Sequence, residues 1–230
     1  IVPCKKIQPR GSSSTSASGG ISRSMLEAID LTCARGEREL FSGLNVTVTP
    51  GLLVAIVGEN GSGKSSLLRM LCGLLPRERG AIRWKGTDIG DLKDEYTQQL
   101  TYLGHLNGTK DDLTPVENLQ ISAHLSGDDD SVSSAREALL AVGLGRRAQG
   151  LPTRVLSQGQ KRRVALARLW LSTRLLWILD EPFAALDDGG VTLLTERFKR
   201  HLDGGGMAVV ATHQDIQLPR ESVRQLRLPG

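Results

Sequence analysis

The stretch from Leu52 to Leu74 constrains the fold of this 230-residue chain more than any other. It begins with the continuous apolar run Leu52–Val57, which is typical of a strand buried on both faces of a parallel sheet. The glycine-rich segment Gly58–Ser65, with the sequence GENGSGKS, follows at once, and we expect a helix from about Lys64 to Leu74 after it. A strand, a glycine loop and a helix in this order predict an α/β fold with a parallel sheet.

The glycine-rich segment fits the pattern GxxxxGK[ST] of a phosphate-binding loop, in the strand-to-helix context that this pattern requires. Its glycines let backbone N–H groups turn toward one anion, and the helix N-terminus adds partial positive charge. Lys64 can reach the β- and γ-phosphates of a nucleotide, and the Ser65 hydroxyl can bind Mg²⁺. The residues predicted to bind nucleotide here are Gly58, Glu59, Asn60, Gly61, Ser62, Gly63, Lys64, Ser65 and Ser66. The alternative is an ordinary glycine-rich turn.

A second chemical feature is the apolar strand expected at Leu175–Leu179, which ends in the carboxylates Asp180 and Glu181. Ligands of a parallel sheet bind at the carboxyl ends of its strands, so both side chains are expected beside the glycine loop. We assign Asp180 to Mg²⁺, directly or through water, and Glu181 to the polarisation of an attacking water. A strand that ends in a solvated acidic turn is the alternative, which the glycine loop upstream disfavours.

The other segments alternate strands and helices around a helical insertion. Further strands are expected at Leu26–Leu31, Leu44–Thr49, Ala81–Trp84, Leu100–Tyr102 and Met207–Ala211. In the insertion Thr114 and Glu117 have the spacing of a capping box, and Ser133 or Ser134 can cap a second helix that runs to about Val142. We therefore expect a helical subdomain at about residues 114–168.

Residues 1–24 are expected to form a disordered Ser- and Gly-rich extension, because they cannot bury enough apolar surface to fold. Met25 is interpreted as the natural start, so that residues 25–230 form one domain. The extension is consistent with a leader peptide, a misassigned upstream start, a cloning remnant or an organellar transit peptide.

Charge and composition disfavour two classes of protein. The formal net charge is +4, but residues 1–24 hold four basic and no acidic residues, and the other 25 Lys and Arg balance the 25 Asp and Glu. We therefore expect no nucleic-acid partner. No apolar run approaches the roughly 18 residues of a membrane span, so membrane contact should come only through a partner. The three cysteines, Cys4, Cys33 and Cys72, lack metal-ligand spacing and are expected to be free thiols.

The segment Leu156–Gln160, with the sequence LSQGQ, precedes a predicted helix at Lys161–Arg168. It resembles the ABC signature LSGGQ, with Gln158 in place of the first glycine. The resemblance implies that Ser157, Gly159 and Gln160 contact the γ-phosphate held by an opposite subunit. It also implies a P-loop NTPase fold of the ABC nucleotide-binding type, with a RecA-like parallel core, an antiparallel β part and a helical subdomain.

Other segments extend this resemblance. Ala184–Asp187 is similar to the D-loop at the dimer interface, so Asp187 is implied as a site residue, and His213 corresponds to the switch histidine that contacts the γ-phosphate. Two positions depart from the ABC pattern. Arg35 stands where an aromatic residue usually stacks on adenine, and Leu106 takes the place of the glutamine of the Q-loop.

More narrowly, the chain resembles the ATP-binding subunit of the cytochrome c maturation haem exporter, the CcmA family. The resemblance covers about residues 25–214 and is strongest at Arg162–Ser172 and Leu176–Phe183. It implies an ATPase that uses ATP and Mg²⁺, forms a homodimer, and docks to a polytopic permease on the cytoplasmic face of the inner membrane. The energy of hydrolysis would serve haem export, or alternatively the release of a haem-loaded chaperone.

Three other classes remain as alternatives. The chain could be an ABC subunit for another substrate, a soluble ABC ATPase that acts on nucleic acid, or a degenerate ATP-binding module without hydrolysis. Lys64, Asp180, Glu181 and His213 are all present, which disfavours the degenerate module.

Overall fold

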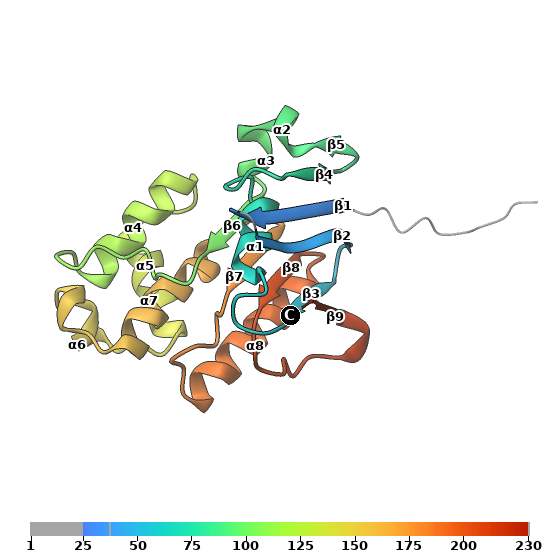
Figure 1. Cartoon of the computed structure of the whole chain (residues 1–230). Coiled ribbons are helices and arrows are strands. Elements are labelled where there is room, and N and C mark those ends of the chain that lie inside the picture. The colour runs from blue at the N-terminus through green and yellow to red at the C-terminus, as the bar shows by residue number, and fades with distance from the viewer. Residues whose placement is uncertain (1–24, 37, 230) are drawn as a thin grey trace, which may run out of the picture.

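The computed structural model describes residues 25–36 and 38–229, which form two sheets with a group of helices beside them (Figure 1). The antiparallel sheet contains, in spatial order, β2 (Arg38–Val48), β1 (Leu26–Arg35), β4 (Arg79–Trp84) and β5 (Thr87–Asp88). The parallel sheet contains β6 (Leu100–Leu103), β7 (Leu176–Asp180), β8 (Met207–Ala211), β3 (Leu53–Val57) and β9 (Val223–Arg227). The expected combination of a parallel core with an antiparallel part is confirmed.

Helices connect these strands. The α-helices are α1 (Lys64–Leu71), α2 (Ile89–Leu92), α3 (Asp94–Thr97), α4 (Pro115–Ser126), α5 (Val132–Ala141), α6 (Arg146–Gln149), α7 (Gln158–Leu171) and α8 (Asp188–Asp203). Short 3₁₀ turns lie at Thr153–Val155 and Arg220–Ser222. Within residues 25–36 and 38–229, no helix has the length and apolar character needed to cross a membrane.

The inner strands of the parallel sheet carry apolar side chains on both faces. In β7, Leu176 and Ile178 pack into the core that α1 and the antiparallel sheet share. Trp177 and Leu179 point to the opposite face and pack into the core that contains α8. This burial on both faces explains why the strand shows a continuous apolar run instead of an alternating pattern.

A third core lies among the helices beside the sheets. Leu119 of α4, Leu139 of α5 and Val164 of α7 belong to this separate buried cluster. Helix α7 also contributes Leu166 and Leu169 to the core of the parallel sheet, so it joins the helical group to the sheet. In Figure 1 helices α4, α5 and α6 lie to one side of both sheets, and α7 connects them to β7.

Some boundaries differ from the sequence-based expectations. Helix α1 ends at Leu71 instead of Leu74, because Gly73 has a φ of 73° and the chain turns there. The first hairpin is longer than expected, since its outer face carries polar residues that gave no strand signal. Helix α5 is capped by Ser131, whose hydroxyl accepts a hydrogen bond from Ser134 N, and not by Ser133 or Ser134.

Several elements had no clear sequence signal. Helix α8 carries Gly189 and Gly190, which are poor helix formers, in its first turn, and it is capped by the Asp187 side chain. Strand β9 is short and largely polar because it lies at the edge of the parallel sheet.

The two described cysteines, Cys33 and Cys72, are buried free thiols, and burial raises the pKa of both.

The half-buried imidazole of His201, near the end of α8, packs against strand β7 of the parallel sheet. Its ring stacks on Trp177 with centroids 3.7 Å apart, and its Nε2 lies 3.1 Å from the carbonyl oxygen of Met207. Burial lowers the pKa of His201 to about 4, although the hydrogen bond to Met207 raises it. The folded protein therefore holds this ring neutral at pH values where an unfolded chain would protonate it.

We predict that His201→Gln reduces the acid sensitivity of the fold. Between about pH 6.5 and about pH 4, the unfolded chain takes up a proton at His201 that the folded chain excludes. The free energy of unfolding should therefore fall more steeply for the wild type than for the variant as pH decreases through this window. Urea unfolding at about pH 7 and about pH 5 measures both slopes. Equal losses in the two proteins would contradict the prediction.

Candidate nucleotide-binding site

The glycine-rich loop joins the end of β3 to the start of α1. Gly63 caps α1 with a φ of 96°, in the left-handed region that favours glycine. A Cβ atom at this position would lie only 3.1 Å from the Phe41 ring. The hairpin therefore crowds the loop from outside, and glycine lets the backbone turn inward at the start of the helix.

The Lys64 side chain folds back over this loop. Its ammonium group donates hydrogen bonds to the carbonyl oxygens of Gly58 at 2.8 Å and Glu59 at 3.0 Å. Lys64 is buried, and these two acceptors are neutral, so its charge is solvated by dipoles rather than by a carboxylate. This arrangement fits a phosphate group, which would provide the missing negative charge.

A cavity of about 320 Å³ lies beside the loop. The predicted site residues that line it are Arg35, Asn60, Gly61, Gly63, Lys64, Ser65, Ser66, Asp180 and Glu181. The end of β1, the loop before α1 and the end of β7 therefore meet at one place. Ser62 of this loop is buried, and its hydroxyl has no hydrogen-bond partner among the described residues.

The two carboxylates leave β7 in different environments. Asp180 is the last residue of the strand and is only 3% exposed. Glu181 follows with a φ of 46°, which is uncommon for a residue other than glycine. Its backbone N–H donates to Ala211 O at 2.9 Å, so the neighbouring strand β8 holds this turn. The result is one buried carboxylate and one that turns away from the strand axis.

His213 follows the end of β8 and lies between the loop and Glu181. Its Nε2 is 3.1 Å from Asn60 Oδ1 and 3.5 Å from Glu181 Oε1. His213 does not line the first cavity but a second one, which Gly58 and Glu59 also line. The imidazole is therefore anchored to both the phosphate-binding loop and the carboxylate.

The residues of the LSQGQ segment lie outside this cavity. Ser157 caps α7, and its hydroxyl accepts a hydrogen bond from Gln160 N at 3.2 Å. The Gln160 side chain in turn accepts one from Ser157 N at 2.9 Å, which completes a capping box. The helix therefore starts at Gln158, inside the segment, and its positive N-terminal end is exposed there.

Gly159 lies against the segment that follows Glu181. A Cβ atom on Gly159 would come within 2.9 Å of the Ala185 carbonyl oxygen, so only glycine fits at this close approach. Asp187 caps α8 by accepting from Gly190 N at 2.9 Å, and it also pairs with Arg163 of α7. The hydrogen bond from Gly190, together with Arg163, lowers the pKa of Asp187.

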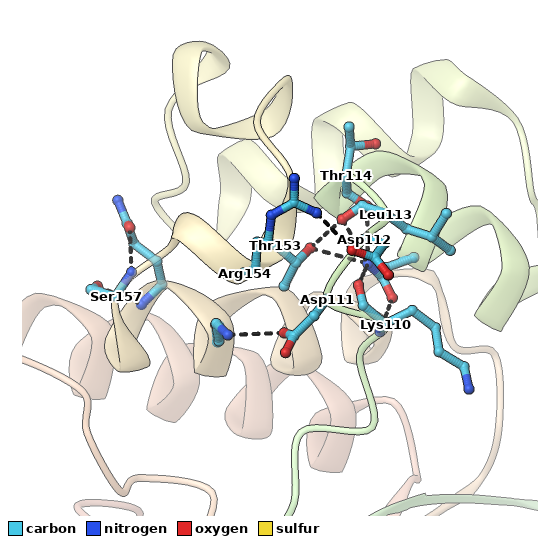
Figure 2. A network of polar contacts seen from close by, with 11 residues as sticks. Lys110, Asp111, Asp112, Leu113, Thr114, Thr153, Arg154 and Ser157 are labelled. Carbon is cyan, nitrogen blue, oxygen red and sulfur yellow. Dashed lines mark hydrogen bonds and ion pairs between the residues drawn. The ribbon is translucent and has the colours of Figure 1, made fainter.

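A polar network fixes the chain just before Ser157 (Figure 2). Thr153 N donates to Leu113 O at 2.8 Å, and Arg154 N donates to Asp111 O at 2.9 Å. Lys161 of α7 donates to Asp111 Oδ1 at 2.9 Å. Residues 110–114 thus hold both the entry to α7 and its first turns in place.

Sequence reasoning did not identify two residues of the cavity. Leu40 of β2 and His105, in the loop after β6, also line it. The signal for His105 was its place at the carboxyl end of a parallel strand that neighbours β7. Leu106, at the position of the expected glutamine, does not line this cavity and is 84% exposed.

Comparisons with known proteins agree with this geometry. A family model described as ABC transporter matches residues 41–184. The solved "Structure of ATP binding subunit of ABC transporter" is 27% identical, with a TM-score of 0.76 over 89% of this chain and 88% of that one. A dimeric post-hydrolysis state of the ATP-binding cassette MJ0796, bound to ADP and Pi, is 25% identical, with a TM-score of 0.75 over 89% of this chain and 94% of that one. The fold and the site define an ATP-binding cassette.

Curated relatives narrow this class. The "Cytochrome c biogenesis ATP-binding export protein CcmA" of Nitrosospira multiformis is 53% identical over 88% of this chain and 98% of its own length. The protein of the same name from Dechloromonas aromatica is 54% identical over 89% of this chain and its full length. The chain belongs to the CcmA family of ABC transporter ATP-binding proteins.

We predict that Lys64→Ala weakens ATP binding by about 10- to 100-fold, because one charge-assisted hydrogen bond to phosphate is lost. Titration with a fluorescent ATP analogue measures the affinity. Lys199→Ala is the matched control, since Lys199 is exposed on α8 and pairs only with Asp203 among the described residues. Unchanged affinity in Lys64→Ala would show that the Lys64 side chain does not hold the phosphates.

Proposed function

We propose that the chain binds and hydrolyses ATP as one half of a two-fold sandwich and drives a membrane permease in cytochrome c biogenesis. The observation that carries this proposal is the division of the site residues within one chain. Lys64, Asp180 and Glu181 share a cavity, whereas Ser157 and Gly159 lie outside it on the exposed end of α7. A second copy is needed to bring a signature segment to the phosphates.

The phosphates and Mg²⁺ would be bound by largely different groups. Backbone N–H groups of residues 58–66 and the N-terminus of α1 hold the phosphates, and Lys64 turns from its two carbonyl acceptors to the β- and γ-phosphates. The residues that would hold Mg²⁺ are Ser65 and Asp180, which suits an ion that takes few protein ligands. When bound, Mg²⁺ neutralises charge on the phosphate oxygens.

The residues that we assign to the nucleotide base are unusual for an ABC protein. Arg35 and Leu40 line the same cavity and would take the place of a stacking aromatic ring. The planar guanidinium of Arg35 can stack on adenine, and Leu40 adds apolar contact. This pair supports purine binding without a hydrogen bond that is specific for adenine.

Hydrolysis rests on Glu181 and His213. Glu181 accepts a proton from the attacking water or polarises it, while His213 is held by Asn60 at the rim of the loop and contacts the γ-phosphate. The partner subunit contributes Ser157, Gly159 and Gln160, with Asp187 at the interface. The chemistry is positioning and charge stabilisation of in-line attack.

In this proposal the folded ATPase domain covers residues 25–230, with the helical subdomain at about residues 114–168. The separate buried cluster among α4, α5 and α7 supports this division. Residues 1–24, including Cys4, lie outside the described residues.

The names of the relatives support a role in export for cytochrome c biogenesis. We place the chain at the cytoplasmic face of the inner membrane, where it contacts the membrane only through the polytopic permease of the haem exporter. No nucleic acid takes part. Release of a haem-loaded chaperone by the same hydrolysis cycle is the alternative use of the energy.

The sandwich is tested by Glu181→Gln, which should bind ATP but hydrolyse it too slowly to release the dimer. Light scattering on a sizing column with ATP and Mg²⁺ should then show a dimer for this variant. Ser157→Arg in the same background should remain monomeric, since a bulky side chain blocks the partner's phosphates. Glu196→Gln on the exposed face of α8 is the matched control and should behave as wild type. A Glu181→Gln protein that stays monomeric would contradict the sandwich.

The physiological role is tested in cells that carry Glu181→Gln as the only copy. Haem-stained gels of their membranes should lose the covalently haem-bearing cytochromes, whereas the other membrane proteins should remain. Cells with Glu196→Gln should stain as wild type. Unchanged staining in Glu181→Gln cells would leave the ATPase in place but remove the role in cytochrome c biogenesis.

A further inference from the structure

Arg162 is a buried arginine in the second turn of α7, directly beneath the LSQGQ segment. Only 4% of it is exposed. Arginine is rarely buried this deeply without a carboxylate partner. The environment of its guanidinium therefore needs a specific explanation.

The guanidinium joins α7 to two other segments of the nucleotide site. Its Nη2 donates to Asp180 O at 2.9 Å and to Glu181 O at 2.6 Å. Its Nη1 donates to Asn107 Oδ1 at 3.2 Å and to Gly104 O at 3.4 Å. One side chain thus spans the end of β7 and the loop that follows β6.

Stability alone does not explain these contacts. The acceptors are three backbone carbonyls and one amide oxygen, and Nε has no hydrogen-bond partner among the described residues. Burial lowers the pKa of Arg162, while the charges of Asp180 and Glu181 raise it. Burial of a charge costs free energy, and neutral acceptors offset that cost less than a carboxylate would. A role in packing would therefore not require a guanidinium here.

The two carbonyls that accept from Nη2 belong to the peptide bonds on either side of Glu181, namely Asp180–Glu181 and Glu181–Pro182. Glu181 itself has a φ of 46°, so the direction of its side chain depends on holding an uncommon backbone conformation. Its N–H is fixed by Ala211, and Arg162 fixes the carbonyls on both sides of that residue. Of these three hydrogen bonds, only the two from Arg162 are made by a side chain.

The other end of the guanidinium reaches the loop that carries His105. Gly104 and Asn107 bracket His105, which lines the cavity, and Leu106, which is 84% exposed. A shift of this loop therefore moves the acceptors of Nη1. Because the guanidinium is rigid and planar, this shift also acts on Nη2, which holds the turn at Glu181.

We propose that Arg162 is a positioning residue that holds Glu181 in the orientation required for hydrolysis and links that orientation to the loop at residues 104–107. The inference rests on the proposed ATPase function. Arg162 does not touch the nucleotide cavity, so it acts through Glu181 and not on the phosphates.

The test compares Arg162→Met, Arg162→Lys and Arg197→Met in steady-state ATP hydrolysis. Arg162→Met should lower kcat by about 10- to 100-fold, because a small displacement of a catalytic group has effects of that size. The KM for ATP should stay within about threefold, since the phosphate loop is untouched. Arg162→Lys should recover part of the loss, because one ammonium can reach the Glu181 turn but cannot also hold the loop. If Arg162→Met does not fold, the Lys variant carries the comparison.

Arg197→Met is the matched control, because Arg197 is also partly buried and donates to one backbone carbonyl, Leu169 O, at 3.1 and 2.7 Å. It should lower the melting temperature without lowering kcat. Asn107→Ala removes only the loop contact and should give a smaller loss of kcat than Arg162→Met. A kcat within about twofold of wild type in Arg162→Met would overturn the proposal.

The failure of this proposal is distinguishable from failure of the proposed function. If the wild type hydrolyses ATP and Arg162→Met does so equally well, only the role of Arg162 is lost. In the Glu181→Gln background, Arg162→Met should still form the ATP-bound dimer, because Arg162 does not line the nucleotide cavity. Loss of that dimer would show that Arg162 supports the fold of the signature helix, and this would also overturn the positioning role.

Discussion

The parallel arrangement of β6, β7, β8 and β3 is the constraint on which the site depends. Because these strands run in one direction, their carboxyl ends meet at one edge of the sheet. The phosphate loop follows β3, His105 follows β6, the carboxylates end β7 and His213 follows β8. Four segments that are distant in sequence therefore contribute to one site without any long loop of their own.

Helix α7 transmits this arrangement to the rest of the chain. It packs through one face against the helical cluster and through another against the parallel sheet. Ser157 caps it, its first turn carries Gln160, and its second turn carries the buried Arg162. A single helix therefore joins the surface offered to a second copy, the helical group, and the turn that orients Glu181.

The parts of the site that could be predicted are each encoded in one short stretch of sequence. The Gly58–Ser65 loop and the carboxylates after β7 were identified because one strand and its following residues contain the whole signal. His105 and Leu40 were missed, since only the packing of separate segments brings them to the cavity. Arg162 was part of the stretch with the strongest family resemblance, but its sequence neighbours indicated no role for it in the site. Its burial follows from long-range contacts with β7 and the loop after β6, which no local pattern encodes.

The close approach of Gly159 to the Ala185 carbonyl has a consequence for communication between two nucleotides. In the two-fold sandwich that we propose, Gly159 would face the partner's nucleotide, whereas Ala185 lies four residues after Glu181 of its own site. Because there is no space for even a methyl group between them, neither segment can shift toward the other without displacing it. In that sandwich each chain would hold a direct contact between the site that it completes and the site that it houses, so that a displacement at one site would press on the other.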